Sequence, residues 1–254
     1  MKESPILFTT DMVQANLDGR KTMTRRIKGL EEIPVNEDVF TKYEYKGLAE
    51  GLPNTHCFAR LWRNNWVETY HAHCPYGIAG DILWVRENFL KPPVITYKML
   101  RDGADTWPKI DYQASCSEIE IDQYKSWGWK LKPSIHMPKD YARIWLQIIN
   151  IRVERLRDIT EEDAKNEGIQ IKPYGSPPFF CTLDYSCKPA KNGFIPGFCA
   201  DTGAQFRESF KTLWESINGS HSWWENPWVW VISFKVLSTT GKPETFQTIY
   251  PIPL

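Results

Sequence analysis

Apolar side chains recur at helical spacing in one long segment near the C-terminus. They share one face of a predicted helix, at Phe206, Phe210, Leu213, Trp214 and Ile217. Asn218-Gly219 follows directly, and glycine is a common residue after a helix end because it adopts positive φ without strain. The pattern predicts an amphipathic helix that buries its aromatic face and is stopped by Asn218-Gly219.

Alternating apolar positions predict strands elsewhere in the chain. The alternation that begins at Ile144 changes phase after Ile148, where Ile149 and Ile151 take it over. Because a shift of one residue turns side chains to the other face of a strand, we predict a β-bulge near Ile148. Two shorter apolar runs predict a buried strand after the Gly80-Asp81 turn and a terminal strand over 228–234.

Capping signals predict two further helices. Thr10 or Asp11 is the expected N-cap of the first, and Gly19 is expected to end it. The second has Thr160 as its expected N-cap, acidic residues in its first turn and Gly168 after its end. Short strands mixed with a few helices favour an α+β fold, a small mixed β-barrel with flanking helices, over a doubly wound sheet.

Composition limits the classes of function. Apolar residues make up 42% and charged residues 24%, which excludes a mainly disordered chain. At 254 residues we expect one elaborated domain spanning 1–254. Lys+Arg and Asp+Glu are both 31, so any nucleic-acid site must be a local feature rather than bulk attraction. The sequence lacks a secretory signal and any apolar run approaching the ~20 residues of a membrane span, so we expect a soluble cytoplasmic protein without a membrane partner.

Cysteine and histidine offer one candidate metal site. His71-Ala-His73-Cys74, together with Cys57, has residue types that suit zinc. The chain contains no Cys-x-x-Cys pair, however, and reduced thiols are the usual state in the cytoplasm. We therefore predict neither a metal nor a cofactor.

A cationic cluster follows the first predicted helix. Five cations lie within nine positions that contain no acid, at Arg20, Lys21, Arg25, Arg26 and Lys28. Such a loop can hold a phosphate, with hydroxyls from Thr22 and Thr24 on the same oxygens. Cations near a helix C-terminus also simply complement its dipole, and for Arg20 the two interpretations are equally supported. For Lys21, Arg25 and Arg26 as a group we favour an anion site.

Lys21, Thr24 and Glu167 are candidates for catalysis. Lys21 and Thr24 are three positions apart, and a neutral lysine can take the proton of a threonine hydroxyl and make it a nucleophile. Glu167 lies in the last turn of the predicted 160–168 helix, where the helix dipole disfavours a carboxylate, as suits a group that exchanges protons. An ordinary exposed glutamate is the simpler interpretation on these grounds alone.

Four segments together resemble an ASCH domain of the PUA-like superfamily. They are Gly19 to Arg25, the Gly80-Asp81 turn with its strand, the Thr160 to Gly168 helix and the Trp230 to Val236 strand. Within that superfamily, the small bacterial acetylcytidine amidohydrolases share the sequence Gly-Arg-Lys-Thr-x-Thr, and their catalytic Lys, Thr and Glu correspond to Lys21, Thr24 and Glu167. The resemblance implies a PUA-like mixed β-barrel and a cleft that binds a nucleoside.

Nearly the whole chain resembles a family of phage and prophage ASCH proteins that has no settled activity. The matching segments are 8–26, 74–87, 133–138, 214–219 and 226–230. Relative to the small amidohydrolases, this chain has insertions at about 35–73, 88–132 and 170–203. Three matched residues therefore imply shared geometry more than a shared substrate.

The expected function is recognition of RNA or of a modified nucleoside, with hydrolysis of an N-acylated nucleobase as its most concrete chemistry. Thr24 would attack the acyl carbonyl, Lys21 would remove its proton, and Glu167 would pass a proton to the leaving amine. The residues expected to contact the substrate are Arg20, Thr22, Arg25, Arg26, Asp81 and His136. A non-enzymatic RNA-binding module and a metal-independent ribonuclease remain as alternatives.

Six of the twelve tryptophans are assigned a role from their positions, four in base stacking and two in the core. Trp127, Trp129, Trp223 and Trp224 are candidates for stacking on exposed nucleobases. Trp228 and Trp230 alternate on the predicted terminal strand, so we expect them in the core.

Overall fold

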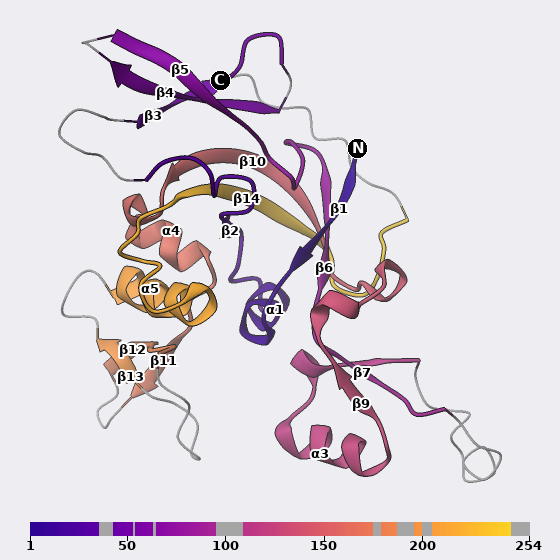
Figure 1. Ribbon diagram of the computed structural model, residues 1–254. Coiled ribbons are helices and arrows are strands. Elements are labelled where there is room, and N and C mark those ends of the chain that lie inside the picture. Colours follow the sequence, from indigo (N-terminus) through magenta and orange to yellow (C-terminus); the bar gives the residue numbers. More distant parts are fainter. Residues whose placement is uncertain are drawn as a thin grey trace.

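The computed structural model describes residues 1–35, 43–52, 54–62, 65–94, 109–174, 179–186, 196–199 and 205–244. A five-stranded sheet forms its centre, with the order β1-β6-β10-β14-β2 (Figure 1). Its strands are β1 (Glu3–Leu7), β6 (Ile82–Arg86), β10 (Trp145–Arg155), β14 (Trp228–Ser238) and β2 (Met23–Arg26). β1 and β6 run parallel, and the other three pairings are antiparallel.

The sheet is strongly curved, but main-chain pairing does not close it into a barrel. β1 and β2 are the two edge strands, and among the described residues no strand pairing joins them. The side chain of Arg26 makes the connection instead, because its guanidinium donates to the carbonyl oxygen of Leu7 at 2.9 Å. The expected α+β class is therefore observed, and the sheet is open along the edge where Arg26 lies.

The longest strands confirm the predicted bulge and core. The register of β10 against β14 shifts between Ile148 and Asn150, at the predicted position. Ile148 is buried and Ile149 is exposed, as the change of phase requires. Trp228 and Trp230 lie in the core as expected.

Three helices pack beside this sheet. They are α1 (Thr10–Leu17), α4 (Glu161–Asn166) and α5 (Gln205–Asn218). The N-cap of α4 is Thr160 as predicted, but that of α1 is Thr9 rather than Thr10 or Asp11. Thr9 has extended backbone angles and its hydroxyl accepts from the amide of Met12, which is the geometry of an N-cap.

α4 also holds α5 in place. The carboxylate of Glu161 accepts from the amides of Phe206 and Arg207, two of the donors left free at the start of α5. α5 buries Phe210, Leu213 and Trp214 as its spacing predicted. Figure 1 shows α4 and α5 together on one side of the central sheet, with α1 next to β1 and β2.

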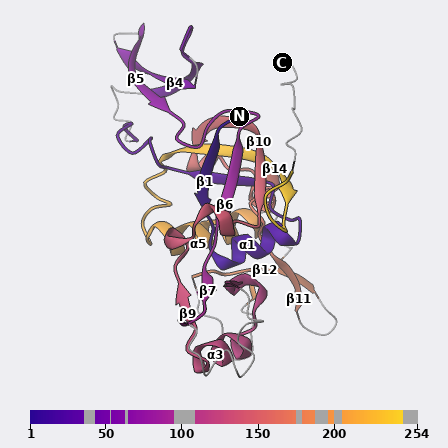
Figure 2. The ribbon, with the colours of Figure 1, turned by 90° about the vertical axis from the view of Figure 1, so that its right-hand side faces the viewer.

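Each of the three predicted insertions carries a small three-stranded sheet. The first contains β3 (Tyr43–Leu48), β4 (Thr55–Trp62) and β5 (Asn65–His73). The second contains β7 (Phe89–Lys91), β8 (Asp111–Tyr112), α3 (Glu118–Ser126) and β9 (Lys130–Lys132). The third contains β11 (Ile171–Tyr174), β12 (Phe179–Leu183) and β13 (Pro196–Cys199). Figure 2 shows the first and second insertions at opposite ends of the molecule.

Short 3₁₀ turns complete the described chain, at Gln113–Ser115, Ser134–His136, Lys139–Tyr141 and Leu156–Asp158. Within the described ranges no helix combines the length and apolar character that crossing a membrane requires. In the same ranges no three His, Cys, Asp or Glu side chains are grouped closely enough to hold a metal ion.

Candidate functional site

The loop after α1 is docked against the end of α4. Gly19 has φ +71, which turns the chain, and the amides of Arg20 and Lys21 both donate to the carbonyl of Ala15. The next amide, that of Thr22, donates to the carbonyl of Asn166 at 2.9 Å. Both helices end where the sequence predicted, and this brings the cationic loop after α1 to the C-terminus of α4.

Gly168 permits this close approach. It has φ +93, and a Cβ atom built there would lie 2.7 Å from the Cβ of Ala15 and 3.0 Å from that of Lys21. The absence of a side chain at this position therefore determines how closely α1 and α4 meet.

Lys21 and Glu167 form a buried ion pair at this junction. Lys21 Nζ lies 2.7 Å from Glu167 Oε2 and 2.7 Å from the main-chain oxygen of Glu167. The two side chains are 0% and 1% exposed. Burial lowers the pKa of Lys21 to about 8, against the opposing attraction of Glu167. A lysine with this pKa is partly neutral near physiological pH and can exchange a proton.

Arg25 connects Glu167 to two further carboxylates. Its guanidinium lies 3.3 Å from Glu167 Oε1, 2.5 Å from Glu154 Oε1 and 2.8 Å from Asp163 Oδ2. Arg152 bonds the same Glu154 and Asp163 from the outside. The carboxylate of Glu167 is thus held between two buried cations, Lys21 and Arg25.

These pairings correct the predicted anion site. Lys21 and Arg25 do not form a free cationic surface, because buried carboxylates already compensate both of them. Arg26 differs. Its guanidinium donates to the carbonyls of Arg25 and Leu7, and it has no carboxylate partner within the described ranges. The cluster contains four cations and three carboxylates, which leaves a formal charge of +1. The cations are Lys21, Arg25, Arg26 and Arg152, and the carboxylates are Glu154, Asp163 and Glu167.

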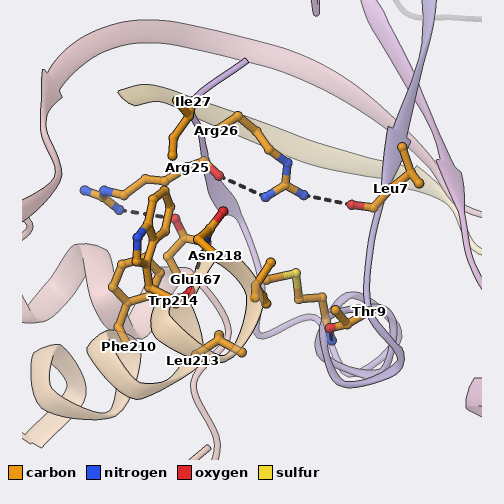
Figure 3. A pocket seen from close by; sticks show the side chains of 12 residues that line it. Leu7, Thr9, Arg25, Arg26, Ile27, Glu167, Phe210, Leu213, Trp214 and Asn218 are labelled. Carbon is orange, nitrogen blue, oxygen red and sulfur yellow. Dashed lines mark hydrogen bonds and ion pairs between the residues drawn. The ribbon is translucent and has the colours of Figure 1, made fainter. Parts of the chain in front are cut away.

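A cavity of about 180 Å³ opens beside this cluster (Figure 3). Its polar lining includes Glu167, Arg25, Arg26, Thr9 and Asn218. Apolar and aromatic side chains form the rest, namely Leu7, Met12, Ile27, Phe210, Leu213, Trp214 and Ile217. Figure 3 shows Arg26 reaching along the cavity toward Leu7, with Arg25 and Glu167 beside Phe210 and Trp214.

A second hollow lies next to this cavity. It has a volume of about 430 Å³ and shares Leu7, Thr9 and Ile217 with the first. Its remaining lining comes from the start of α1 and from Asn88 and Ser134, which flank the second insertion. We call the first volume the inner cavity and the second the outer hollow, and together we call them the cleft.

Thr24 lies close to this cluster in the sequence but is enclosed. Its side chain is fully buried on β2, and its Oγ1 has no hydrogen-bond partner among the residues that the structure describes. The expected contact between the Lys21 amine and this hydroxyl is therefore not formed, because the amine bonds Glu167 instead. A buried hydroxyl without a partner is uncommon in folded proteins and calls for an explanation.

Four of the predicted substrate contacts lie outside the cavity lining. Arg20 bonds Asp18 and the carbonyl of Gly168, and it lines a separate small pocket next to Tyr185. Thr22 is exposed and contributes main-chain hydrogen bonds. Neither residue lines the cavity, so their contact with a substrate stays a prediction.

Asp81 and His136 are the other two predicted contacts that lie outside the cavity lining. The carboxylate of Asp81 accepts from the amides of Lys2 and Ile78, so it fixes the start of β1 and the turn before β6. It lies at the opposite end of β1 from Leu7, about 13 Å along the strand. His136 is exposed in a 3₁₀ turn, and Ser134 of that turn reaches the outer hollow instead.

The predicted stacking tryptophans divide into buried and exposed residues. Trp129 and Trp223 are buried, so the prediction is wrong for these two. Trp127 and Trp224 are 46% and 61% exposed. The aromatic side chains that do line the cavity are Phe210 and Trp214 of α5, which the helical spacing had assigned only to the core.

Comparison of the chain with protein-family models, curated proteins and solved structures found no match. The geometry of the cleft is accordingly the basis for a functional assignment.

Proposed function

We propose that the protein is a PUA-like protein of the ASCH type that binds a nucleobase in this cavity and hydrolyses an N-acyl amide on the base. The observation that carries the proposal is the position of Glu167. Its carboxylate lines the cavity on one side and bonds a fully buried lysine of lowered pKa on the other. A proton can therefore pass between a bound ligand and an enclosed amine, as general acid and base catalysis requires.

The cavity has the size and lining that suit a single base. Its volume of about 180 Å³ is below the ~300–1,000 Å³ typical of sites for larger ligands. Phe210 and Trp214 offer aromatic faces for stacking, and the side chain of Asn218 can bond the polar edge of a base. The outer hollow would then receive the sugar and whatever is attached to it.

The proposed reaction proceeds through an acyl ester on Thr24. The Thr24 oxygen bonds to the acyl carbon, and its proton goes to neutral Lys21. When the carbon–nitrogen bond breaks, the exocyclic nitrogen of the base takes a proton delivered through Glu167 from Lys21. Water then cleaves the ester, which releases the carboxylic acid and restores the threonine hydroxyl. Arg26 is placed to stabilise negative charge that develops on the acyl oxygen.

This reaction requires a local rearrangement. Lys21 must turn its amine from Glu167 toward Thr24, and the enclosed Thr24 hydroxyl must open toward the cavity. Because that hydroxyl has no partner within the described ranges, no hydrogen bond to these residues has to be broken for it to move. Catalytic contacts are often formed only in the complex with substrate, so the present geometry is compatible with this requirement.

The pairing of Arg25 favours a hydrolase over a module that grips phosphates with the whole cationic loop. Arg25 and Lys21 are compensated by buried carboxylates, so Arg26 is the cation of this group that is left for a ligand. A single available cation suits a small ligand or one reacting group better than a run of phosphates.

The test is incubation of the protein with N-acylated cytidines and adenosines, followed by mass spectrometry of the released nucleosides. We expect release by the wild type and by Thr24→Ser, which keeps a hydroxyl. We expect none from Thr24→Val, which matches the shape of threonine without its hydroxyl, and a loss of at least about a hundredfold for Glu167→Gln. Survival of every substrate at high protein concentration would exclude the proposed activity for these compounds.

A further inference from the structure

The small sheet of the second insertion has two chemically different faces. Its strand order is β8-β7-β9, and residues directly opposite each other in the register share a face. Leu90 lies opposite both Leu131 and Asp111, so these three residues share one face. Phe89 lies opposite Lys132, and Lys91 opposite Lys130, and all four share the other face.

α3 covers the first of these faces. The hydroxyl of Tyr124 on α3 donates to the carboxylate of Asp111 at 2.5 Å. The acidic residues of α3 therefore belong to the side of the sheet away from the lysines. On the second face, Phe89 packs with Met137 and partly buried Tyr141, which anchor one end of the sheet to the core.

The other end of the second face presents three lysines, Lys91, Lys130 and Lys132, which we term the lysine face. Lys91 and Lys130 are exposed and lie directly opposite each other, a placement of like charges that destabilises a strand pair. Lys132 is half-buried on the same face. None of the three has a carboxylate partner among the residues that the structure describes.

The lysine face is continuous with the cleft along the chain. Asn88 immediately precedes β7, and Ser134 follows Lys132 by two residues. Both Asn88 and Ser134 line the outer hollow, and the amide of Ser134 donates to the side chain of Asn88 at 2.8 Å. Figure 1 shows β7 and β9 extending from the end of the sheet next to α1, and Figure 2 shows the same insertion below α1. A chain that leaves the hollow therefore meets Lys132 first and then Lys91 and Lys130.

We propose that the lysine face binds the phosphates of a single-stranded nucleic acid whose target base enters the inner cavity. The substrate would then be a base within a strand, and the insertion would hold the flanking nucleotides. Lys91 and Lys130 carry like charges directly opposite each other, and a bound polyanion would reduce their repulsion, which supports this assignment. The choice of a nucleic acid over an acidic protein rests on the function proposed above.

The test measures the binding of a fluorescein-labelled oligouridylate of twelve nucleotides by fluorescence anisotropy at several salt concentrations. In the variant, Lys91, Lys130 and Lys132 are all changed to glutamine. The matched control is Lys125→Gln, an exposed lysine on α3, which covers the other face of the sheet. We expect the control to bind as the wild type does. For the triple variant we expect at least a tenfold weaker affinity, and a log–log salt slope reduced by about 0.7 for each lost phosphate contact.

Three results would overturn the proposal. One is that the wild type fails to bind the oligonucleotide at low salt. Another is that the triple variant, with an unchanged thermal transition, binds with the same affinity and salt slope. The third is that a twelve-residue oligoglutamate binds the lysine face more tightly than the oligouridylate. Hydrolysis of free N-acylated nucleosides is measured separately and does not need the lysine face, so its presence or absence decides the proposed function independently.

Discussion

Lys21 Nζ and Glu167 Oε2 lie 2.7 Å apart, joining residues that are 146 positions apart in the chain. Neither side chain is more than 1% exposed. Removing two charges from water is costly, and a buried ion pair recovers that cost only when both partners remain. Near neutral pH, where Lys21 still carries its proton, the junction between the loop after α1 and the end of α4 therefore depends on the carboxylate of Glu167 beside the buried amine.

Glu167→Gln should destabilise the fold by about 3–5 kcal/mol, because it leaves Lys21 and Arg25 without their shared carboxylate. Urea denaturation followed by tryptophan fluorescence measures the change. The control is the double variant Lys21→Met/Glu167→Gln, which removes the uncompensated lysine as well and should recover part of the loss. If Glu167→Gln alone unfolds at the wild-type urea concentration, the pair is not compensating buried charge.

The pH dependence of stability provides a second prediction. The pKa of Lys21 is about 8 in the folded protein because of burial, against an ordinary value of 10.5. Between these pH values the unfolded chain holds a proton that the folded chain has released. The free energy of unfolding contributed by Lys21 therefore rises with pH in this window, by up to about 1.4 kcal/mol per pH unit, and is flat below pH 8.

Comparison with Lys21→Met isolates this contribution, since the remaining titrating groups are common to both proteins. Urea denaturation at pH 7, 8, 9 and 10 should show the wild type gaining stability relative to the variant only above pH 8. A constant difference across the four pH values would mean that Lys21 does not titrate there.

Local signals predicted the ends of the two helices that meet at the Lys21–Glu167 junction, but not the ion pair itself. Gly19 turns the chain after α1, and Thr160 and Gly168 delimit α4, whereas the sequence analysis expected Lys21 to contact Thr24. The partners of Arg25 could not be located in this way. Glu154 and Asp163 reach it from 129 and 138 positions away, and their meeting depends on how β10 and α4 pack against β2.

Asp81 and the adjacent Trp223 and Trp224 also have surroundings that local sequence signals could not predict. The Gly80-Asp81 turn was predicted correctly, but the Asp81 carboxylate is used by the amides of Lys2 and Ile78 rather than by a ligand. Trp223 and Trp224 are adjacent in the sequence, yet one is buried and the other exposed. Whether each tryptophan is buried or exposed depends on how the loop after α5 packs, and no local sequence pattern determines that packing.

Gly168→Ala should destabilise the protein more than the same change at another glycine of similar φ. Its Cβ would lie 2.7 Å from the Cβ of Ala15, so α1 and α4 would have to separate in addition to the strain of positive φ. Gly19→Ala is the matched control, since φ there is +71 and nothing lies within 4 Å of its Cβ. We expect a loss of about 1 kcal/mol for Gly19→Ala and at least about 2 kcal/mol more for Gly168→Ala, measured by urea denaturation. Equal losses at the two positions would show that the helices have room to adjust.

Thr24→Val should stabilise the fold while abolishing hydrolysis. The two side chains have nearly the same shape, and the buried Thr24 hydroxyl has no hydrogen-bond partner in the described part of the chain. Replacing it with a methyl group therefore removes an unsatisfied polar atom. We expect an increase of about 1 kcal/mol in the free energy of unfolding, together with complete loss of nucleoside release. Thr24→Ser is the control that keeps the nucleophilic oxygen but loses a buried methyl group, so it should be less stable than the wild type and still active. A Thr24→Val protein that releases nucleoside at the wild-type rate would show that Thr24 is not the nucleophile. Glu167, which lines the cavity directly, would then be the group that activates water for attack on the acyl carbon.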